Sequence, residues 1–180
     1  MTEPILAVDG LSAMSDRDRS ILHDVSLTVN RGETRGLLGE SGAGKSTIGK
    51  AILGILPGAV RITAGKIFFE ERDLLTMPEA LLRKLVGEQI ALIPQDPMTA
   101  LNPGRRIEGQ LTDGLRLWRG LDRNAARRIA LNLMEEVHIR DPERVLGSYP
   151  HELSGGMRQR VLIAAAFALE PKLIDRKSVV

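Results

Sequence analysis

The chain has 180 residues, of which 43% are hydrophobic and 27% charged, as expected for one globular domain. Its net charge of +2 and its aromatic content of 3% do not indicate a nucleic-acid-binding surface. The absence of cysteine excludes a disulfide framework and a thiolate metal site. We expect no signal peptide, and the longest apolar run, Val161 to Leu169, is too short to span a membrane.

The first half of the chain alternates between predicted strands and helices. Val25, Leu27 and Val29 alternate with Ser26 and Thr28, which is the period of a strand. A glycine-rich loop separates a short apolar run from a stretch with helical spacing that stops at a Pro-Gly pair. These patterns predict strands at residues 25–29, 36–38, 66–69 and 90–93, and helices at 48–55 and 78–86.

From about Asp96 the pattern changes to helices. Two of them are predicted from apolar residues at helical spacing: Ile107, Leu111, Leu115 and Trp118 in one, and Ala126, Ile129, Ala130, Leu133, Met134 and Val137 in the other. Ser154 is expected to cap a last helix, which Glu170 and Pro171 end. The pattern as a whole predicts an α/β core that is interrupted by a helical insertion.

Residues 39–46 read GESGAGKS and match the phosphate-loop pattern G-x-x-x-x-G-K-[ST] without a mismatch. The glycines let backbone N–H groups surround an anion, and the helix that follows adds the positive end of its dipole. Lys45 would reach the β- and γ-phosphates, and Ser46 would bind Mg²⁺. The residues predicted to bind nucleotide here are Gly39, Glu40, Ser41, Gly42, Ala43, Gly44, Lys45, Ser46 and Thr47.

A second glycine-containing segment lies before the last predicted helix. It reads LSGGMRQR from Leu153 and resembles the signature motif, LSGGQ, of ABC-type ATPases. In that family the signature loop of one subunit contacts the γ-phosphate held by the other. The resemblance therefore implies nucleotide contacts by Leu153, Ser154, Gly155, Gly156 and Met157.

The segment from Ile93 to Pro103 resembles the Q-loop of the same family. Gln95 stands at the end of a predicted strand, and the resemblance implies that it contacts the metal and the attacking water. We therefore expect Gln95 to be the catalytic residue present here, and Ser46 and Gln95 to be the metal contacts. Three segments resemble, in their amino-acid sequence, the ATPase subunits of peptide and nickel importers: this one, Tyr149 to Glu152, and Arg61 to Gly65.

The resemblance implies an α/β fold of the P-loop NTPase class, the ABC nucleotide-binding domain. We expect an N-terminal antiparallel β portion, a helical insertion and an incomplete parallel core. The domain is predicted to span residues 1–174, with a RecA-like core at 1–95, a helical subdomain at about 96–153 and the signature helix at 154–169. Residues 175–180 are predicted to be a tail unrelated to the family.

The sequence departs from the family pattern in three places. Arg176 follows Asp175 where a glutamate is expected, so we do not assign Asp175 to the Walker B pair. The switch histidine is missing, because His23, His138 and His151 lie too early and are expected to be solvated or structural. The adenine-stacking aromatic near Met14 is also missing. We therefore expect a C-terminally truncated chain that is defective in hydrolysis.

The function implied is that of an ATPase subunit that energises import of peptides or nickel, with ATP and Mg²⁺ as cofactors. The expected partners are a second ABC ATPase, identical or paralogous, transmembrane permeases and, indirectly, a solute-binding protein, but no nucleic acid. We expect the protein at the cytoplasmic face of the inner (plasma) membrane. Two alternatives stay open: a soluble ABC-type ATPase that is not coupled to transport, and an inactive nucleotide-binding fragment.

Overall fold

The computed structural model describes residues 4–40 and 42–176. The chain forms two compact units, Met1–Arg83 and Lys84–Val180, and each is described here by itself. The first unit contains an antiparallel sheet and the second a parallel strand pair with a group of helices. Both strand types that the sequence predicted are therefore present.

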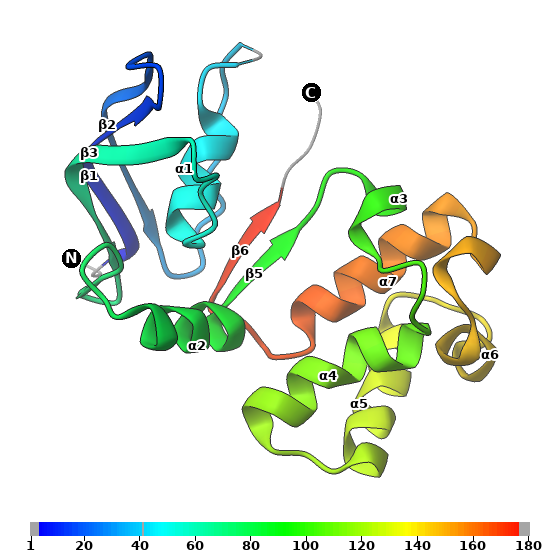
Figure 1. Ribbon diagram of the computed structural model, residues 1–180. Coiled ribbons are helices and arrows are strands. Elements are labelled where there is room, and N and C mark those ends of the chain that lie inside the picture. The colour runs from blue at the N-terminus through cyan, green and yellow to red at the C-terminus, as the bar shows by residue number, and fades with distance from the viewer. Residues whose placement is uncertain (1–3, 41, 177–180) are drawn as a thin grey trace. The chain divides into compact units, whose positions relative to one another are not determined.

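The first unit is built on a four-stranded antiparallel sheet in the order β2-β1-β3-β4 (Figure 1). Its core consists of side chains that alternate along the strands, and Leu11, Ile67 and Phe69 are fully buried. Gly65 has a φ of +96°, and a Cβ there would lie 2.5 Å from the Leu11 Cα. Only glycine permits this close approach of two strands. The strands are β1 (Pro4–Ser15), β2 (Ser20–Asn30), β3 (Val60–Phe69) and β4 (Arg72–Asp73).

Helix α1 (Lys45–Ile52) follows the glycine-rich loop, as predicted, although Ile55 lies beyond its end and is exposed. The predicted strand at residues 36–38 is wrong, because residues 33–40 form no regular secondary structure. Leu38 is 83% exposed. A strand needs a hydrogen-bonding neighbour, and in the described part of the chain no strand pairs with this segment.

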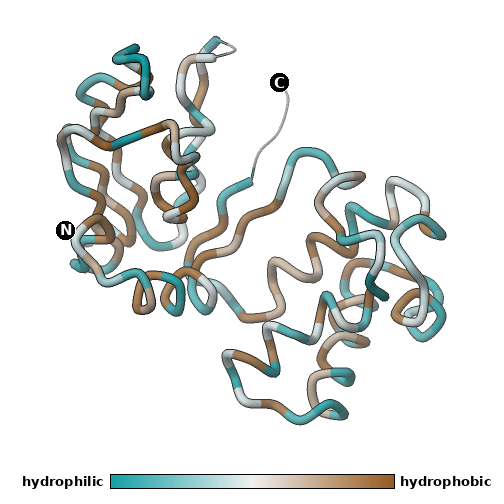
Figure 2. The backbone as a smooth tube through the Cα atoms, viewed as in Figure 1, coloured by the Kyte–Doolittle hydropathy of each residue, from teal (hydrophilic) through white to brown (hydrophobic). Residues whose placement is uncertain are grey.

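The second unit contains two parallel strands, β5 (Ile90–Ile93) and β6 (Leu173–Arg176). Helix α2 (Glu79–Gln89), which crosses the boundary between the units, leads directly into β5. Figure 2 shows β5 as continuously hydrophobic, whereas β6 changes to hydrophilic at its end. The strand at 90–93 was predicted from its apolar run, as is typical of a buried parallel strand.

The remaining helices pack around a common core in the second unit, where α4, α5 and α7 contact one another (Figure 1). Ile107, Ala130, Met134 and Val161 are fully buried in it, which confirms the predicted apolar faces. Among the described helices, none combines the length and the apolar character that crossing a membrane requires. The helices are α3 (Pro97–Ala100), α4 (Ile107–Arg119), α5 (Arg123–Glu136), α6 (Pro142–Gly147), a 3₁₀ turn (Pro150–Glu152) and α7 (Gly155–Phe167).

Candidate nucleotide-binding site

The glycine-rich loop runs into the N-terminus of α1 and is anchored there by Gly44. This residue is the N-cap, with φ of 83°. A Cβ on Gly44 would lie 2.5 Å from Leu22 Cδ2 and 2.9 Å from the Ile21 carbonyl oxygen. Glycine is therefore required both by the backbone conformation and by the close approach of the start of β2. Ser41, which the sequence also places in this loop, lies outside the described residues.

The side chain of Lys45 closes the loop. Its Nζ donates to the carbonyl oxygens of Gly39 at 2.5 Å and Glu40 at 2.8 Å. An ammonium group has three N–H donors, so one remains for a phosphate oxygen. The geometry holds the positive charge at the mouth of the loop, beside the exposed residues 39, 40, 42 and 43.

The start of α1 adds further donors. The first N–H groups of a helix have no partner within the helix and attract anions. Two nearby N–H groups are already engaged within the chain, since that of Ala43 donates to the Glu40 carbonyl at 3.1 Å and that of Thr47 donates to the Gly44 carbonyl at 2.8 Å. Ser46 is exposed, and its hydroxyl is accessible at the first turn of α1. The loop can therefore bind a polyphosphate, and the hydroxyl of Ser46 suits a hard cation such as Mg²⁺.

Gln95 lies in the second unit, two residues after β5, and is exposed. Its strand is held by the buried Ile90 and Ile93, which fixes where the segment leaves the sheet. The next residue, Asp96, is the N-cap of α3, and its Oδ1 accepts from the Met98 N–H at 2.8 Å. The position at the carboxyl end of a buried parallel strand agrees with the motif, and the role of Gln95 stays a prediction.

The signature segment begins α7. Ser154 is the N-cap, as predicted, and its Oγ accepts from the Met157 N–H at 3.3 Å. Leu153 is buried and anchors the turn, whereas Ser154, Gly155 and Gly156 are exposed. A Cβ on either glycine would meet no described heavy atom within 4 Å. Packing within the described chain therefore does not require glycine at these two positions. Their small size leaves an open surface over the start of α7.

Two arginines of the LSGGMRQR segment hold the start of α7 in place. Neither had been given a role from the sequence. Arg158 donates from Nε to the Leu153 carbonyl at 3.1 Å. A guanidinium nitrogen of Arg160 donates to the carbonyls of Val137 at 3.1 Å and His138 at 2.7 Å, beyond the end of α5. Their position in the first turns of the last helix could have suggested a supporting role. Their acceptor carbonyls could not be predicted, because the approach of these groups depends on tertiary structure.

Among the described residues, no group of three or more His, Cys, Asp or Glu side chains could hold a metal ion, and none of the three histidines belongs to such a group. The ring of His151 stacks on Tyr149, with centroids 5.7 Å apart, and the Arg106 guanidinium lies 5.1 Å from the Tyr149 ring. His151 therefore has a structural contact. Met14 and Ser15, near which the resemblance implied an aromatic residue, end β1.

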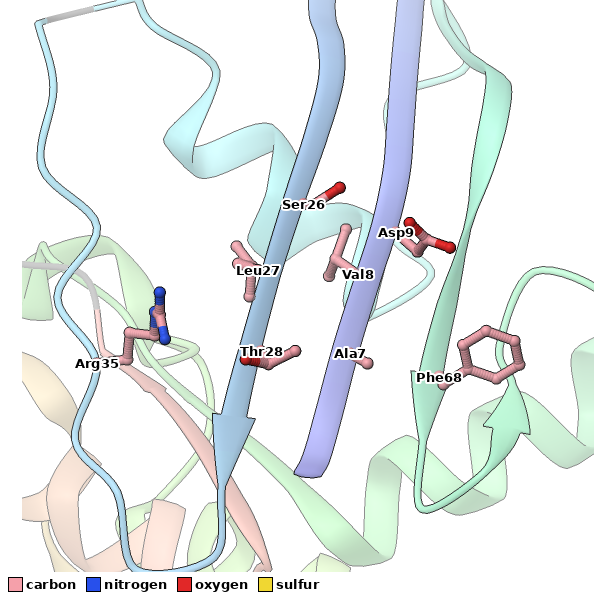
Figure 3. Close-up of a pocket in the computed structure, with 8 residues that line it drawn as sticks. All are labelled: Ala7, Val8, Asp9, Ser26, Leu27, Thr28, Arg35 and Phe68. Carbon is pink, nitrogen blue, oxygen red and sulfur yellow. The ribbon is translucent and has the colours of Figure 1, made fainter. Parts of the chain in front are cut away.

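A shallow hollow of about 530 Å³ lies on the sheet of the first unit (Figure 3). Its walls come from β1, β2 and β3, with Arg35 contributed by the segment after β2. None of the phosphate-loop residues that the structure describes lines the hollow. Its lining residues are Ala7, Val8, Asp9, Ser26, Leu27, Thr28, Arg35 and Phe68.

The fold and the glycine-rich loop before α1 are those of an ABC-type nucleotide-binding domain. The model of the ABC transporter family matches residues 22–174, and the chain belongs to this family. Two solved structures confirm the fold. The ATP-binding cassette MJ0796, dimeric and bound to ADP and Pi, gives a TM-score of 0.81 at 25% identity, over 95% of this chain and 72% of that one. CbiO1 of Clostridium perfringens gives 0.78 at 26% identity, over 97% of this chain and 65% of that one.

Among curated relatives, the probable D,D-dipeptide transport ATP-binding protein DdpD of Escherichia coli is 46% identical, over 97% of this chain and 54% of that protein. The oligopeptide transport ATP-binding protein OppD of Haemophilus influenzae is 42% identical, over 85% of this chain and 47% of that protein. The chain thus spans about half the length of these relatives. The predicted resemblance to the family and its fold class are confirmed.

Proposed function

We propose that the chain is the ATP-binding part of an ABC transporter subunit that energises the import of peptides. The observation that carries this proposal is the loop closed by Lys45 and anchored by Gly44, a cradle for phosphates at the start of α1. The names of the relatives, which concern dipeptides and oligopeptides, support peptides as the transported class. Nickel as the transported solute is supported only by the resemblance of the Q-loop sequence.

In this proposal, ATP is held mainly through its phosphates. Lys45 and the N–H groups of the loop bind the β- and γ-phosphates. Ser46 and Gln95 offer neutral oxygen atoms, which fit Mg²⁺ as ligands. When bound, Mg²⁺ would neutralise part of the phosphate charge. The sequence has no aromatic residue before Phe68, where the resemblance implies an adenine-stacking ring, so we expect the phosphates rather than the base to dominate the affinity.

The proposed partner is a second ABC ATPase subunit, identical or paralogous. The open surface over Ser154, Gly155 and Gly156 would contact the γ-phosphate held by that subunit. ATP binding would then favour the closed pair and act on transmembrane permeases. A solute-binding protein would deliver the peptide, and the subunit would lie at the cytoplasmic face of the membrane. We propose no nucleic-acid partner.

Hydrolysis needs a group that polarises the attacking water. In β6, Asp175 lies beside Leu92 and Arg176 beside Ile93 in the parallel register. Arg176 follows Asp175 where the resemblance to the family led us to expect a glutamate, and arginine cannot act as a general base because it stays protonated. We therefore propose that residues 173–176 support binding and not turnover, so ATP should trap the closed pair.

The test is ATP-dependent association, measured by sedimentation velocity with Mg²⁺. We expect ATP to convert the chain to a dimer, and neither Lys45→Ala nor Ser154→Ala alone to form one. An equal mixture of the two variants should associate, because it regains one site with an intact loop and an intact signature. Asp122→Ala is the matched control, since it removes the cap of α5 without touching either loop. Association that is insensitive to both loop variants would contradict the proposal.

A further inference from the structure

A second hollow, of about 380 Å³, lies within the second unit. Its walls come from the end of α2, the end of α4 and the segment between α7 and β6. None of its lining residues belongs to the segments assigned to nucleotide binding. The volume is within the range of about 300 to 1,000 Å³ that is usual for small-molecule sites. We call it the Trp118 hollow, after the aromatic residue that lines it.

The apolar wall of the Trp118 hollow is the indole ring, which packs on the end of α2. A Cβ on Gly87 would lie 2.8 to 2.9 Å from three atoms of the ring, so glycine lets the ring approach the helix backbone closely. Leu169 adds a second apolar side chain to the lining. An aliphatic or aromatic group of a ligand can pack against such a wall.

Gln89 brings an unused hydrogen-bond acceptor to the same place. Its Oε1 is buried and has no hydrogen-bond partner among the described residues. A buried acceptor without a partner is costly, and native proteins retain few of them. The last torsion of a glutamine side chain rotates easily, so a turn of the amide presents this oxygen to the hollow that Gln89 lines. A ligand with an N–H group would supply the missing donor.

Two cationic side chains line the Trp118 hollow. Arg119 is fixed there, because its guanidinium donates to the Leu169 carbonyl oxygen at 2.6 Å. Lys172 is exposed, and its backbone N–H donates to the Gln89 carbonyl oxygen at 2.9 Å, which holds its segment beside the end of α2. Both cations can therefore meet a carboxylate of a ligand.

Two carboxylates line the hollow as well, and neither is tightly paired. Glu170 lies 3.4 Å from a guanidinium nitrogen of Arg119, and its side chain is 81% exposed. The side chain of Glu88 is 29% exposed, and the Lys84 ammonium is 4.0 Å away, too far for a hydrogen bond. A cationic group of a ligand would find acceptors here.

We propose that the Trp118 hollow binds a small zwitterion with an apolar side chain, that is, an α-amino acid or a short peptide. A pure anion would face two carboxylates and a pure cation two basic side chains, whereas a zwitterion can place each charge beside an opposite one. Its ammonium group supplies the donor that Gln89 lacks, and its side chain packs on Trp118. This inference does not depend on the proposed function, because it involves no nucleotide contact.

The test is binding of leucine and of leucyl-leucine to the full chain without nucleotide. Equilibrium dialysis measures binding, and the emission of Trp118, the single tryptophan, reports whether the probe occupies the hollow. We expect at least one probe to bind saturably with a Kd below about 1 mM and to shift the emission maximum. Tighter binding of leucine would indicate a site for amino acids, and tighter binding of leucyl-leucine a site for peptides. The N-acetyl derivative of the tighter probe lacks the ammonium charge and should bind roughly 10- to 100-fold more weakly.

Two variants test the assigned acceptors. Gln89→Leu and Glu88→Gln should each weaken binding by about 10-fold, as expected for loss of a hydrogen bond to a charged group. Glu79→Gln, at the other end of α2, removes the same charge away from the hollow and should leave the affinity unchanged. Gln89→Leu should not lower the urea midpoint, because it replaces an acceptor that has no partner among the described residues.

Absence of saturable binding, or binding that leaves the Trp118 emission unchanged, would overturn the proposal. Equal affinity for a probe and its N-acetyl derivative would also overturn it, since the ammonium group would then not be recognised. Equal losses in Glu88→Gln and Glu79→Gln would show that only net charge matters and would overturn the assigned site. None of these measurements involves ATP or association. Their failure is therefore distinguishable from failure of the proposed function.

Discussion

The ammonium group of Lys45 lies 2.5 Å from the Gly39 carbonyl oxygen and 2.8 Å from that of Glu40, so the loop is closed by the side chain expected to meet a phosphate. The same group thus orders the loop and supplies its charge. A nucleotide would find the donors already arranged, which reduces the entropy lost on binding. We therefore expect nucleotide affinity to depend more on Lys45 than on any other residue of the loop.

Replacing Lys45 by alanine should lower ATP affinity by about 10- to 100-fold, as expected for loss of charge-assisted hydrogen bonds to phosphate. The comparison is Lys50→Ala, which removes a positive charge from the last turn of α1. Titration calorimetry in the presence of Mg²⁺ measures both. Equal losses in the two variants would show that only net charge matters and would contradict the assignment of Lys45.

In the first unit, comparing two glycines with positive φ distinguishes the cost of backbone strain from the cost of a steric clash. Gly32 has φ of +74° and a Cβ there would meet no described atom within 4 Å, whereas at Gly65 it would lie 2.5 Å from the Leu11 Cα. Gly32→Ala should lower the free energy of unfolding by about 1 kcal/mol through strain alone. Gly65→Ala should lower it by about 3 kcal/mol or more, because β1 must also move. Urea unfolding measures both, and equal losses would show that β1 and β3 do not approach this closely.

The single tryptophan reports on a tight contact between α2 and α4. A Cβ on Gly87 would lie 2.8 to 2.9 Å from three atoms of the Trp118 ring. In a helix, alanine would otherwise be better than glycine by about 1 kcal/mol. We expect Gly87→Ala to displace the ring toward water and to shift its fluorescence emission to longer wavelength. Gly114→Ala is the control, since its Cβ would make an ordinary contact with Leu169 at 3.4 Å. An unchanged emission maximum in Gly87→Ala would contradict this packing.

An ion pair on the helical surface predicts a pH-dependent contribution to stability. The hydrogen bond from Arg127 lowers the pKa of the Glu143 carboxyl below its usual 4.5, and the same hydrogen bond raises the pKa of Arg127. A carboxyl with a lowered pKa in the folded chain adds stability above pH 4.5, and that stability is lost as the pH falls through the folded value. Glu143→Gln should therefore be less stable than the natural chain at neutral pH and equal to it in strong acid.

The pair is exposed, so the effect should be small and should shrink as salt is added. Urea midpoints across the pH range measure it. Glu136→Gln, at the end of the same helix as Arg127, is the control. A Glu143→Gln difference that persists in strong acid would show that the effect does not come from ionisation.

The elements predicted correctly were those whose signal is local. The apolar run of Ile90–Ile93 and the helical spacing after Ile107 identify elements without knowledge of their neighbours. The first half of β3 was missed although Val60, Ile62 and Ala64 alternate with Arg61 and Thr63, because Gly65 interrupts the pattern and pairing with β1 decides that the strand continues through it. Helices α3 and α6 were missed because four to six residues carry too little periodicity.

In the candidate site, too, local features could be predicted, whereas features that depend on distant residues could not. The helix that follows the glycine-rich loop and the Ser154 cap were predicted correctly because their signals lie in consecutive residues, and phosphate binding by the loop stays a prediction. The strand expected at residues 36–38 failed because pairing, not the local run of apolar residues, decides whether a strand forms. The contact between Arg158 and Met98 could not be predicted, since it joins residues 60 apart whose approach depends on the packing of α3 against α7.

The central claim, that the chain binds nucleotide through phosphates held by Lys45 and the loop, is tested most directly by comparing ATP with AMP. Calorimetric titration of the chain with each nucleotide in Mg²⁺ should give saturable ATP binding and an AMP affinity at least about 10-fold weaker, since AMP lacks the two phosphates that the loop and Lys45 bind. Equal affinity for the two nucleotides, or no binding of ATP by the folded chain, would contradict the claim.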